Sequence, residues 1–261
     1  MLPTEDLTLS LIQAPMHWEK PEENRRQWAQ ALEPVENTDL ILLPEMFTTG
    51  FSMNPQHLAE EFPGPTLAWM QEQAHKKQAT IAGSVMSAAG GQYYNRLLWV
   101  EPDGQYRHYD KKHLFSLAGE EKIYSPGQER LLVTCKGWRI NPQICFDLRF
   151  PVWCRNDADF HLQFFVACWP ARRRQAWNAL LPARAIENVC FVAGLNRVGE
   201  DGNGVYHTGD SAVYDPLGTP VEQAVPGATQ IVKTTLSASH LAKVRAKFAF
   251  LEERDHFQLL H

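Results

Sequence analysis

The chain has 261 residues, of which 44% are hydrophobic, so it has enough apolar material for a continuous core. It carries 25 Lys and Arg against 30 Asp and Glu, a formal net charge of -5, which excludes the broad basic surface of a nucleic-acid-binding protein. The 5 cysteines are scattered and never in CxxC spacing, which argues against a disulfide framework and a structural zinc site. We therefore expect a cytoplasmic protein with no metal and no nucleic-acid partner.

The N-terminal stretch MLPTEDLTLSLIQAP has acidic residues ahead of its apolar part and lacks the basic start of a signal peptide. Apolar runs along the chain stay shorter than the roughly 18 residues that a membrane span requires. We therefore expect no membrane partner. Because linkers, repeats and low-complexity tracts are missing from the sequence, it predicts a single domain over residues 1–261.

The first third of the chain alternates between strand and helix patterns. The predicted elements are, in chain order, a strand over residues 7–13, a helix over 21–32, a strand over 39–45, a helix over 66–77 and a strand over 79–86. The second and third strands are continuous apolar runs of the kind buried on both faces. This order predicts an α/β fold with parallel pairing.

The rest of the chain is richer in strands. Turn residues predict one hairpin within residues 93–111, around Pro102-Asp103-Gly104, and another that joins 131–134 to 138–144. The remaining predicted elements are a strand over residues 161–170, a helix over 173–188, a strand over 189–198, a hairpin over 211–221 and a helix over 238–252.

Three polar residues stand at the ends of separate strand-like runs: Glu45, Lys111 and Cys145. Sites in open α/β sheets form outside the carboxyl ends of strands, so these side chains could meet there. Each residue alone has a commoner interpretation, namely a solvated carboxylate, a surface lysine and a buried inert thiol. Spacing alone therefore leaves their convergence a hypothesis.

The three residue types together suit the cleavage of an amide. A cysteine attacks a carbonyl carbon, but it needs a neighbouring base or cation because the thiolate is the nucleophile. A glutamate can take the thiol proton, pass it to the departing ammonia and then activate a water. A lysine and a backbone N–H can stabilise the negative oxygen of the tetrahedral intermediate.

Four motifs occur in the order typical of the nitrilase, or carbon–nitrogen hydrolase, superfamily. They are LLPEMF at residues 42–47, DKKHLF at 110–115, ICFDLRFP at 144–151 and ARAIEN at 183–188, and the resemblance closes with GDSAVYDPLG at 209–218. Each motif is weak by itself, but their ordered combination over nearly the whole chain is specific. The sequence thus resembles this superfamily.

The resemblance implies a four-layer α-β-β-α sandwich and a homodimer, with no metal or organic cofactor. It implies Glu45 as base, Lys111 as oxyanion partner and Cys145 as nucleophile, with the backbone N–H of Phe146 as a second oxyanion donor. A second glutamate of the family lies six residues before the proline of a Pro-Gly pair, which points to Glu120, with Glu121 as its rival.

The stretch ICFDLRFPVW is most similar to the omega-amidase branch, which implies a 2-oxo acid amide such as 2-oxoglutaramate as substrate and a cysteine thioester as intermediate. The carboxylate of such a substrate requires a basic receptor, for which the candidates are Arg149, Arg172 and Arg173. Three aromatic residues close to the motifs are expected to line the pocket: Phe47, Phe115 and Trp169.

Several alternatives stay open at this point. The bond cleaved could be that of a nitrile or an N-carbamoyl amide, and a catalytically silent scaffold that binds a protein partner is the alternative of another class. His113 could act as the base of a cysteine protease, although we expect it, Asp147 and Arg149 to have local structural roles. The segment 44–55 departs from the omega-amidase pattern and leaves substrate size open, and we predict that the loop 115–127 forms part of a lid.

Overall fold

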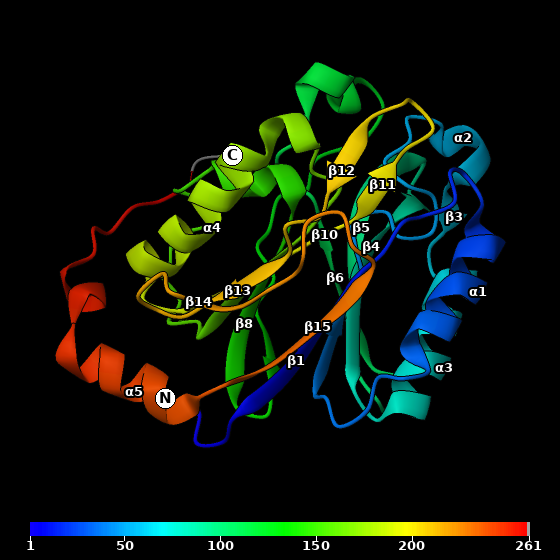
Figure 1. The fold of residues 1–261 in the computed structure, drawn as a ribbon. Helices are drawn as coiled ribbons and strands as arrows, with labels where there is room; N and C mark the ends of the chain where they lie inside the picture. The colour runs from blue at the N-terminus through cyan, green and yellow to red at the C-terminus, as the bar shows by residue number, and fades with distance from the viewer. Residues whose placement is uncertain (260–261) are drawn as a thin grey trace.

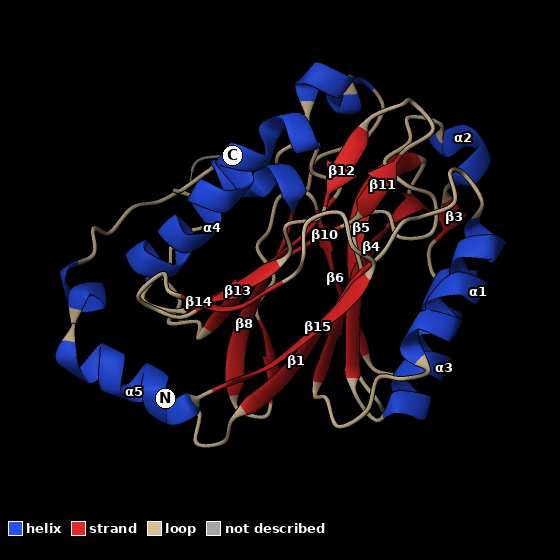
Figure 2. Ribbon diagram, viewed as in Figure 1, coloured by secondary structure: helices blue, strands red, loops and turns tan. Residues whose placement is uncertain are grey.

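The computed structural model describes residues 1–259 and consists of two β-sheets packed face to face, with helices on both outer sides (Figures 1 and 2). The helices α1 (Pro21–Leu32) and α3 (Pro65–Lys77) cover one sheet, and α4 (Arg174–Asn188) and α5 (Ala238–Lys247) lie on the side of the other. This arrangement confirms the predicted α-β-β-α sandwich.

The first sheet has the strand order β15-β1-β2-β4-β5-β6, with β3 paired to β4 off this path. Its pairs β1–β2 and β2–β4 are parallel, as the strand–helix alternation predicts, whereas the outer pairs are antiparallel. Its strands are β1 (Leu7–Gln13), β2 (Leu40–Leu42), β3 (Glu60–Glu61), β4 (Thr80–Ala89), β5 (Gln92–Val100), β6 (Tyr106–Asp110) and β15 (Gln230–Leu236).

The second sheet has the order β14-β13-β10-β9-β8-β7, and its central pairs β8–β9 and β9–β10 are parallel. Its strands are β7 (Val133–Cys135), β8 (Trp138–Ile144), β9 (Leu162–Ala167), β10 (Phe191–Asn196), β13 (Ala212–Tyr214) and β14 (Pro220–Gln223). A separate hairpin is formed by β11 (Val198–Glu200) and β12 (Tyr206–Thr208). The short helices are α2 (Pro55–Leu58) and the 3-10 turns η1 (Ser116–Ala118), η2 (Glu120–Lys122), η3 (Cys145–Arg149), η4 (Ala171–Arg173) and η5 (Phe250–Glu253).

The short strand β2 shows why a continuous apolar run suits this architecture. Successive side chains of a strand point to opposite faces. Leu40 and Leu42 therefore enter the core between the two sheets, whereas Ile41 packs in the cluster that contains Trp28 of α1 and Met70 of α3. Both faces of β2 are buried, and only leucine and isoleucine occupy it.

The element predictions are confirmed in kind and differ mainly at the ends. The last predicted helix, 238–252, is wrong in its second half because α5 ends at Lys247 and a separate turn, η5, follows. Strand β15 and the hairpin β11–β12 were not predicted from the sequence. Within residues 1–259, none of the helices is both long enough and apolar enough to cross a membrane.

Candidate active site

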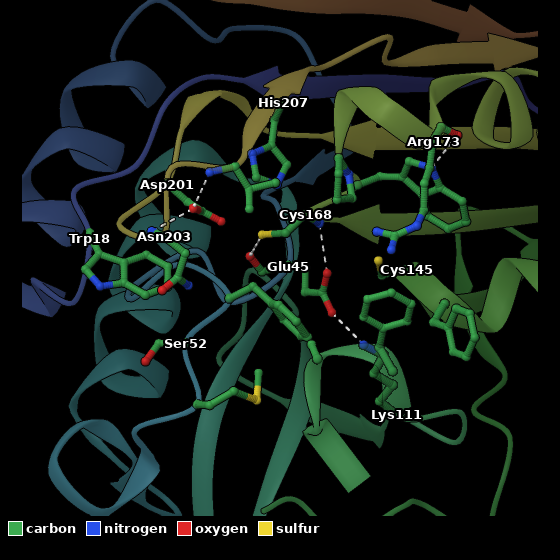
Figure 3. A pocket seen from close by; sticks show the side chains of 18 of the residues that line it. Trp18, Glu45, Ser52, Lys111, Cys145, Cys168, Arg173, Asp201, Asn203 and His207 are labelled. Carbon is green, nitrogen blue, oxygen red and sulfur yellow. Dashed lines mark hydrogen bonds and ion pairs between the residues drawn. The ribbon is translucent and has the colours of Figure 1, made fainter.

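Glu45, Lys111 and Cys145 meet at one end of the sandwich, beside a cavity of about 550 Å³ that all three line (Figure 3). Glu45 lies just beyond β2, Lys111 directly follows β6, and Cys145 directly follows β8. The three side chains therefore meet beyond the ends of strands, as we expected. They come from both sheets, because β8 belongs to the opposite sheet from β2 and β6.

Glu45 is fully buried, and both oxygens of its carboxylate are held by hydrogen bonds. Oε1 accepts hydrogen bonds from Lys111 Nζ at 2.8 Å and from Asn95 Nδ2 at 2.8 Å. Oε2 accepts one from the backbone N–H of Cys168 at 2.8 Å. These donors compensate for the solvation that the carboxylate has lost by burial.

Glu120 completes the group. Lys111 Nζ lies 3.1 Å from its Oε1 and 2.9 Å from its Oε2, and the backbone N–H of Phe115 donates to Oε2 at 2.6 Å. Glu121 is exposed to solvent, so the structure places Glu120 and not its rival beside the lysine. We call the four fully or almost fully buried residues Glu45, Asn95, Lys111 and Glu120 the buried centre.

Lys111 is positioned by backbone contacts on both sides of its own residue. Its N–H donates to the carbonyl of Asn95 at 2.9 Å, and its carbonyl accepts from the N–H of Gly127 at 2.9 Å. A Cβ atom at position 127 would lie 2.0 Å from the carbonyl oxygen of Asp110. Only glycine allows the chain to pass this closely, so Gly127 fixes the return of the loop over Lys111.

Cys145 adopts a left-handed backbone conformation, with φ of 45°. This conformation is unfavourable for a residue with a Cβ and occurs where the surrounding structure imposes it. Asp147 does so here, because its Oδ2 accepts hydrogen bonds from the N–H of Ile144 at 3.1 Å and from the hydroxyl of Tyr109 at 2.8 Å. The expectation that Asp147 fixes the turn is confirmed.

Cys145 is only 9% exposed. Burial raises its pKa well above the ordinary value, and the charge of Glu45 and a hydrogen bond to it raise the pKa further, while Lys111 opposes them. Burial lowers the pKa of Lys111, but the negative charges of Glu120 and Glu45 outweigh it, so the net shift is upward. At neutral pH the centre therefore holds a neutral thiol and a charged lysine.

His113 does not reach the thiol as a base would. Its N–H donates to Asp147 Oδ1 at 3.0 Å, its Nδ1 lies 2.8 Å from the same oxygen, and its ring stacks on Phe150 with centroids 3.6 Å apart. These three contacts, the first of them made by the backbone N–H, hold His113 against the turn beyond Cys145. His113 has the local structural role that we expected, and the cysteine–histidine protease alternative loses its base.

Three arginines lie along one side of the cavity, and we call Arg149, Arg172 and Arg173 the arginine wall. Arg149 lies 5.1 Å from the ring centre of Trp169, and Arg173 lies 4.9 Å from that of Phe115. Within residues 1–259 none of the three forms an ion pair, whereas the next residue, Arg174, pairs with Asp210. Arg149 and Arg173 each lie over an aromatic ring instead.

Arg173 differs from the other two wall residues. Its Nη1 is buried and has no hydrogen-bond partner within the described part of the chain. Burial and the positive charges of Arg172 and Arg149 lower the pKa of Arg173. A buried guanidinium N–H without an acceptor is costly, so this atom is poised to receive an anionic ligand.

Of the three aromatic residues expected to line the pocket, Phe115 and Trp169 do so, and Phe146, expected there for its backbone N–H, also lines the cavity. Phe47 does not, and this expectation is wrong. Its ring is fully buried on the helix side of the first sheet, 6.4 Å from the ring centre of Trp28 and 5.9 Å from that of Trp69. Phe47 follows the base candidate in sequence, but the turn at residues 45–47 sends the two side chains apart.

A comparison with known families decides the identity. The family model described as carbon–nitrogen hydrolase matches residues 8–246. The chain is a carbon–nitrogen hydrolase. The predicted family and class of reaction are confirmed, and the architecture agrees with that of solved members.

The relatives of this hydrolase cover it almost completely. It is 44% identical to omega-amidase YafV of Yersinia enterocolitica, over 97% of this chain and 99% of the relative. It is 32% identical to 2-oxoglutaramate amidase of Bacillus subtilis, over 94% and 96% of the two chains. It is 49% identical to XC1258 of Xanthomonas campestris, a CN-hydrolase superfamily protein whose crystal structure has an arsenic adduct in the active site; the two folds agree with a TM-score of 0.96 over 98% and 100% of the two chains.

Two contributors to the hydrolase site were missed by sequence reasoning. Asn95 lies inside β5 between Tyr94 and Arg96, where an asparagine reads as an ordinary strand position. Cys168 donates its backbone N–H to the carboxylate of Glu45, a contact with no side-chain signature, and its Sγ also donates to the carbonyl oxygen of Glu45 at 3.2 Å. The predicted lid segment supplies Phe115 and Ala118 to the cavity lining, and the divergent segment 44–55 supplies residues 51–54. Closure of the lid stays a prediction.

Residues 1–259 contain no group of three or more His, Cys, Asp or Glu arranged to hold a metal ion.

Proposed function

We propose that this hydrolase cleaves the terminal amide of a small 2-oxo dicarboxylic acid monoamide, such as 2-oxoglutaramate, to the acid and ammonia. The names of its relatives, omega-amidase and 2-oxoglutaramate amidase, point to this substrate class. The observation that carries the proposal is the buried, unpartnered Nη1 of Arg173 in the same cavity as Cys145. An acyl chain with a carboxylate at its far end would satisfy that group.

In the first half of the proposed reaction, Glu45 takes the proton of the Cys145 thiol and the sulfur attacks the amide carbon. A base is needed because burial keeps the pKa of this thiol high. Lys111 Nζ and the N–H of Phe146 stabilise the negative oxygen of the tetrahedral intermediate. The C–N bond then breaks, and ammonia leaves with the proton held by Glu45.

In the second half, a water attacks the thioester while Glu45 takes one of its protons. The C–S bond breaks, the acid departs, and the proton returns to the sulfur of Cys145. Glu120 keeps Lys111 charged throughout, since it provides a second carboxylate 2.9 Å from Nζ. No step requires a cofactor, and none was expected from the sequence.

We also propose that the hydrolase is a cytoplasmic homodimer. Its cysteines are all free, which suits a reducing compartment. Ile186 of α4 and Leu217 of the β13–β14 turn are 55% and 48% exposed, and Gly218, the chain neighbour of Leu217, lies against Ile186, because a Cβ on Gly218 would lie 2.7 Å from it. Such an exposed apolar pair suits a subunit contact, and the molar mass in solution would test it.

The decisive experiment measures ammonia release from 2-oxoglutaramate, glutamine, a short aliphatic amide and a nitrile. Cys145→Ala is the test variant, and Cys190→Ala, which changes a buried cysteine that does not line the cavity, is the matched control. Release from the oxo-acid amide that disappears only in Cys145→Ala supports the proposal. Release from another substrate alone would overturn the specificity, and equal release by both variants would remove Cys145 from the mechanism.

A further inference from the structure

The cavity is larger than the proposed substrate. 2-Oxoglutaramate has about ten non-hydrogen atoms, which fill at most about 300 Å³ if each takes the roughly 30 Å³ of a water molecule in the liquid. The cavity measures about 550 Å³. A substantial part of it therefore remains free when such a substrate reaches from Cys145 to Arg173.

Figure 3 shows Trp18, Asp201 and Asn203 on the far side of Glu45 and Cys168 from Cys145 and Arg173, so the free part extends in this direction. Its lining comes from the segment after β1 and from the β11–β12 hairpin. We call it the acceptor lobe and define it by Trp18, Glu19, Asp201, Asn203 and His207.

The acceptor lobe offers oxygens and nitrogens with free lone pairs. Glu19 Oε1 accepts a hydrogen bond from the hydroxyl of Ser52 at 2.5 Å. Asp201 Oδ1 accepts from the N–H groups of Asn203 at 2.9 Å and Val205 at 3.0 Å, which fix the carboxylate and leave Oδ2 available. Both residues are only partly exposed.

His207 adds a buried acceptor, since it is only 2% exposed. Its Nδ1 lies 3.3 Å from the carbonyl oxygen of Gly199. A carbonyl can only accept, so Nδ1 carries the hydrogen and Nε2 is left with its lone pair. Burial and the charge of Arg197 lower the pKa of His207, so the ring is neutral at pH 7.

Trp18 supplies a rigid aromatic wall. A Cβ on Gly202 would lie 2.3 Å from its indole ring, and a Cβ on Gly50 would lie 3.0 Å from the opposite part of the ring. The indole is thus clamped between two glycines. Counting the buried Arg197 nearby, Glu19 and Asp201 still leave this end negative by one charge, and a carboxylate-lined aromatic pocket suits a cation that carries N–H donors.

The direction of the reaction says which part of a substrate would enter the acceptor lobe. If the acyl carboxylate lies at Arg173 and the carbonyl carbon at Cys145, the amide nitrogen faces Glu45, which must protonate it. A substituent on that nitrogen continues away from Arg173. We propose that the acceptor lobe binds the amine part of N-substituted amides, and that the hydrolase cleaves secondary amides whose amine carries a cationic group.

This inference rests on the proposed function and uses the same steps. The C–S bond forms and the C–N bond breaks as before, and the substituted amine leaves with the proton that Glu45 took from Cys145. Water then hydrolyses the thioester to the same acid. The cation makes no new bond; it adds binding energy on the leaving-group side.

Three amides of 2-oxoglutarate at the terminal carboxyl group test the proposal: the primary amide, the N-[2-(dimethylamino)ethyl] amide and the N-(3-methylbutyl) amide. The last two have the same shape, but only the first of them is cationic at neutral pH. We expect kcat/KM for the cationic amide to exceed that for the neutral one about fivefold, as a partly exposed charge pair allows. In Asp201→Asn, which keeps an acceptor oxygen for the loop, this ratio should fall towards one.

Glu200→Gln is the matched control, because Glu200 is exposed, adjacent in sequence and outside the cavity lining, and it should leave the ratio unchanged. Cleavage of the primary amide without cleavage of either secondary amide would overturn the inference and leave the proposed function standing. Equal rates for the two secondary amides would also overturn it, as would a ratio that Asp201→Asn does not alter. Failure to cleave even the primary amide would instead overturn the proposed function.

Discussion

The buried centre and the arginine wall line the same cavity but treat charge in opposite ways. In the centre, Lys111 lies between Glu45 and Glu120, and the side chains of all three are 0% exposed. In the wall, three arginines crowd together without an acidic partner in the described chain, and one N–H of Arg173 is buried without an acceptor. The centre is complete before a substrate arrives, whereas in the proposed function the wall is completed by the carboxylate of the substrate. The proposed function thus separates reaction chemistry and substrate recognition in space.

The sharpest way to break the centre is to remove its only positive charge. Lys111→Met would leave two buried carboxylates without their counter-charge, so we expect the free energy of unfolding to fall by about 3–5 kcal/mol and kcat to fall about 10³-fold. Chemical denaturation and ammonia release measure the two effects.

Lys112→Met is the matched control for this change. Lys112 is only partly buried and lies 3.3 Å from Gln128, so its loss should change stability by less than about 0.5 kcal/mol. A fully active Lys111→Met, or equal damage by both substitutions, would contradict the assignment of Lys111.

A milder change keeps the shape of the centre and alters its charge. Glu120→Gln turns one carboxylate into an amide whose NH₂ group opposes Lys111, and we expect kcat to fall about 10²-fold. Glu121→Gln changes the exposed neighbour and should have no effect. Thermal unfolding of both variants shows whether the fold is kept, and a normal kcat for Glu120→Gln would reduce Glu120 to a packing role.

A substitution in the arginine wall should weaken substrate binding and leave the rate of the chemical steps unchanged. Arg173→Met should raise KM for 2-oxoglutaramate about 10–100-fold, because a charge-assisted hydrogen bond of about 1.5–3 kcal/mol is lost, and should leave kcat nearly unchanged. Arg174→Met is the control, since Arg174 pairs with Asp210 and does not line the cavity. A similar loss for an amide without a carboxylate would show that Arg173 does not recognise that group.

The burial of the Cys145 thiol should make its reactivity depend on pH. Because the pKa of the Cys145 thiol lies well above its ordinary value, the thiolate fraction should still rise as pH is raised from 7 to 9, about tenfold per unit. The rate of iodoacetamide labelling at Cys145, followed by mass spectrometry, should rise accordingly. A plateau already reached at pH 7 would instead indicate a thiolate formed in advance.

Most of the fold could be predicted from hydrophobic patterning, but the site only in part. Glu45, Lys111 and Cys145 stand at strand ends, a position visible in the sequence, and the motif resemblance led to Glu120. Asn95 was missed because one polar residue inside a strand has no distinctive pattern. Strand β15 was missed because it is only partly buried along its length and alternates weakly, so its pairing with β1 depends on tertiary contacts.

The error at Phe47 and the unranked arginine candidates have a common physical cause. Sequence distance from a motif says little about which way a side chain points after a turn. Phe47 lies two residues from Glu45 and faces α1 and α3, whereas Arg173 could not be ranked above its neighbours until burial of its Nη1 singled it out.

The hydrogen bond from position 168 to the carboxylate of Glu45 is made by the main chain. Every amino acid except proline can make it, so in a mutational scan alanine and serine should be tolerated at this buried position, whereas proline should abolish activity. A comparison of related sequences need not show a conserved residue at this position, since the side chain can change while the main-chain contact is kept. Part of this site therefore depends on backbone geometry, which neither residue conservation nor alanine scanning detects.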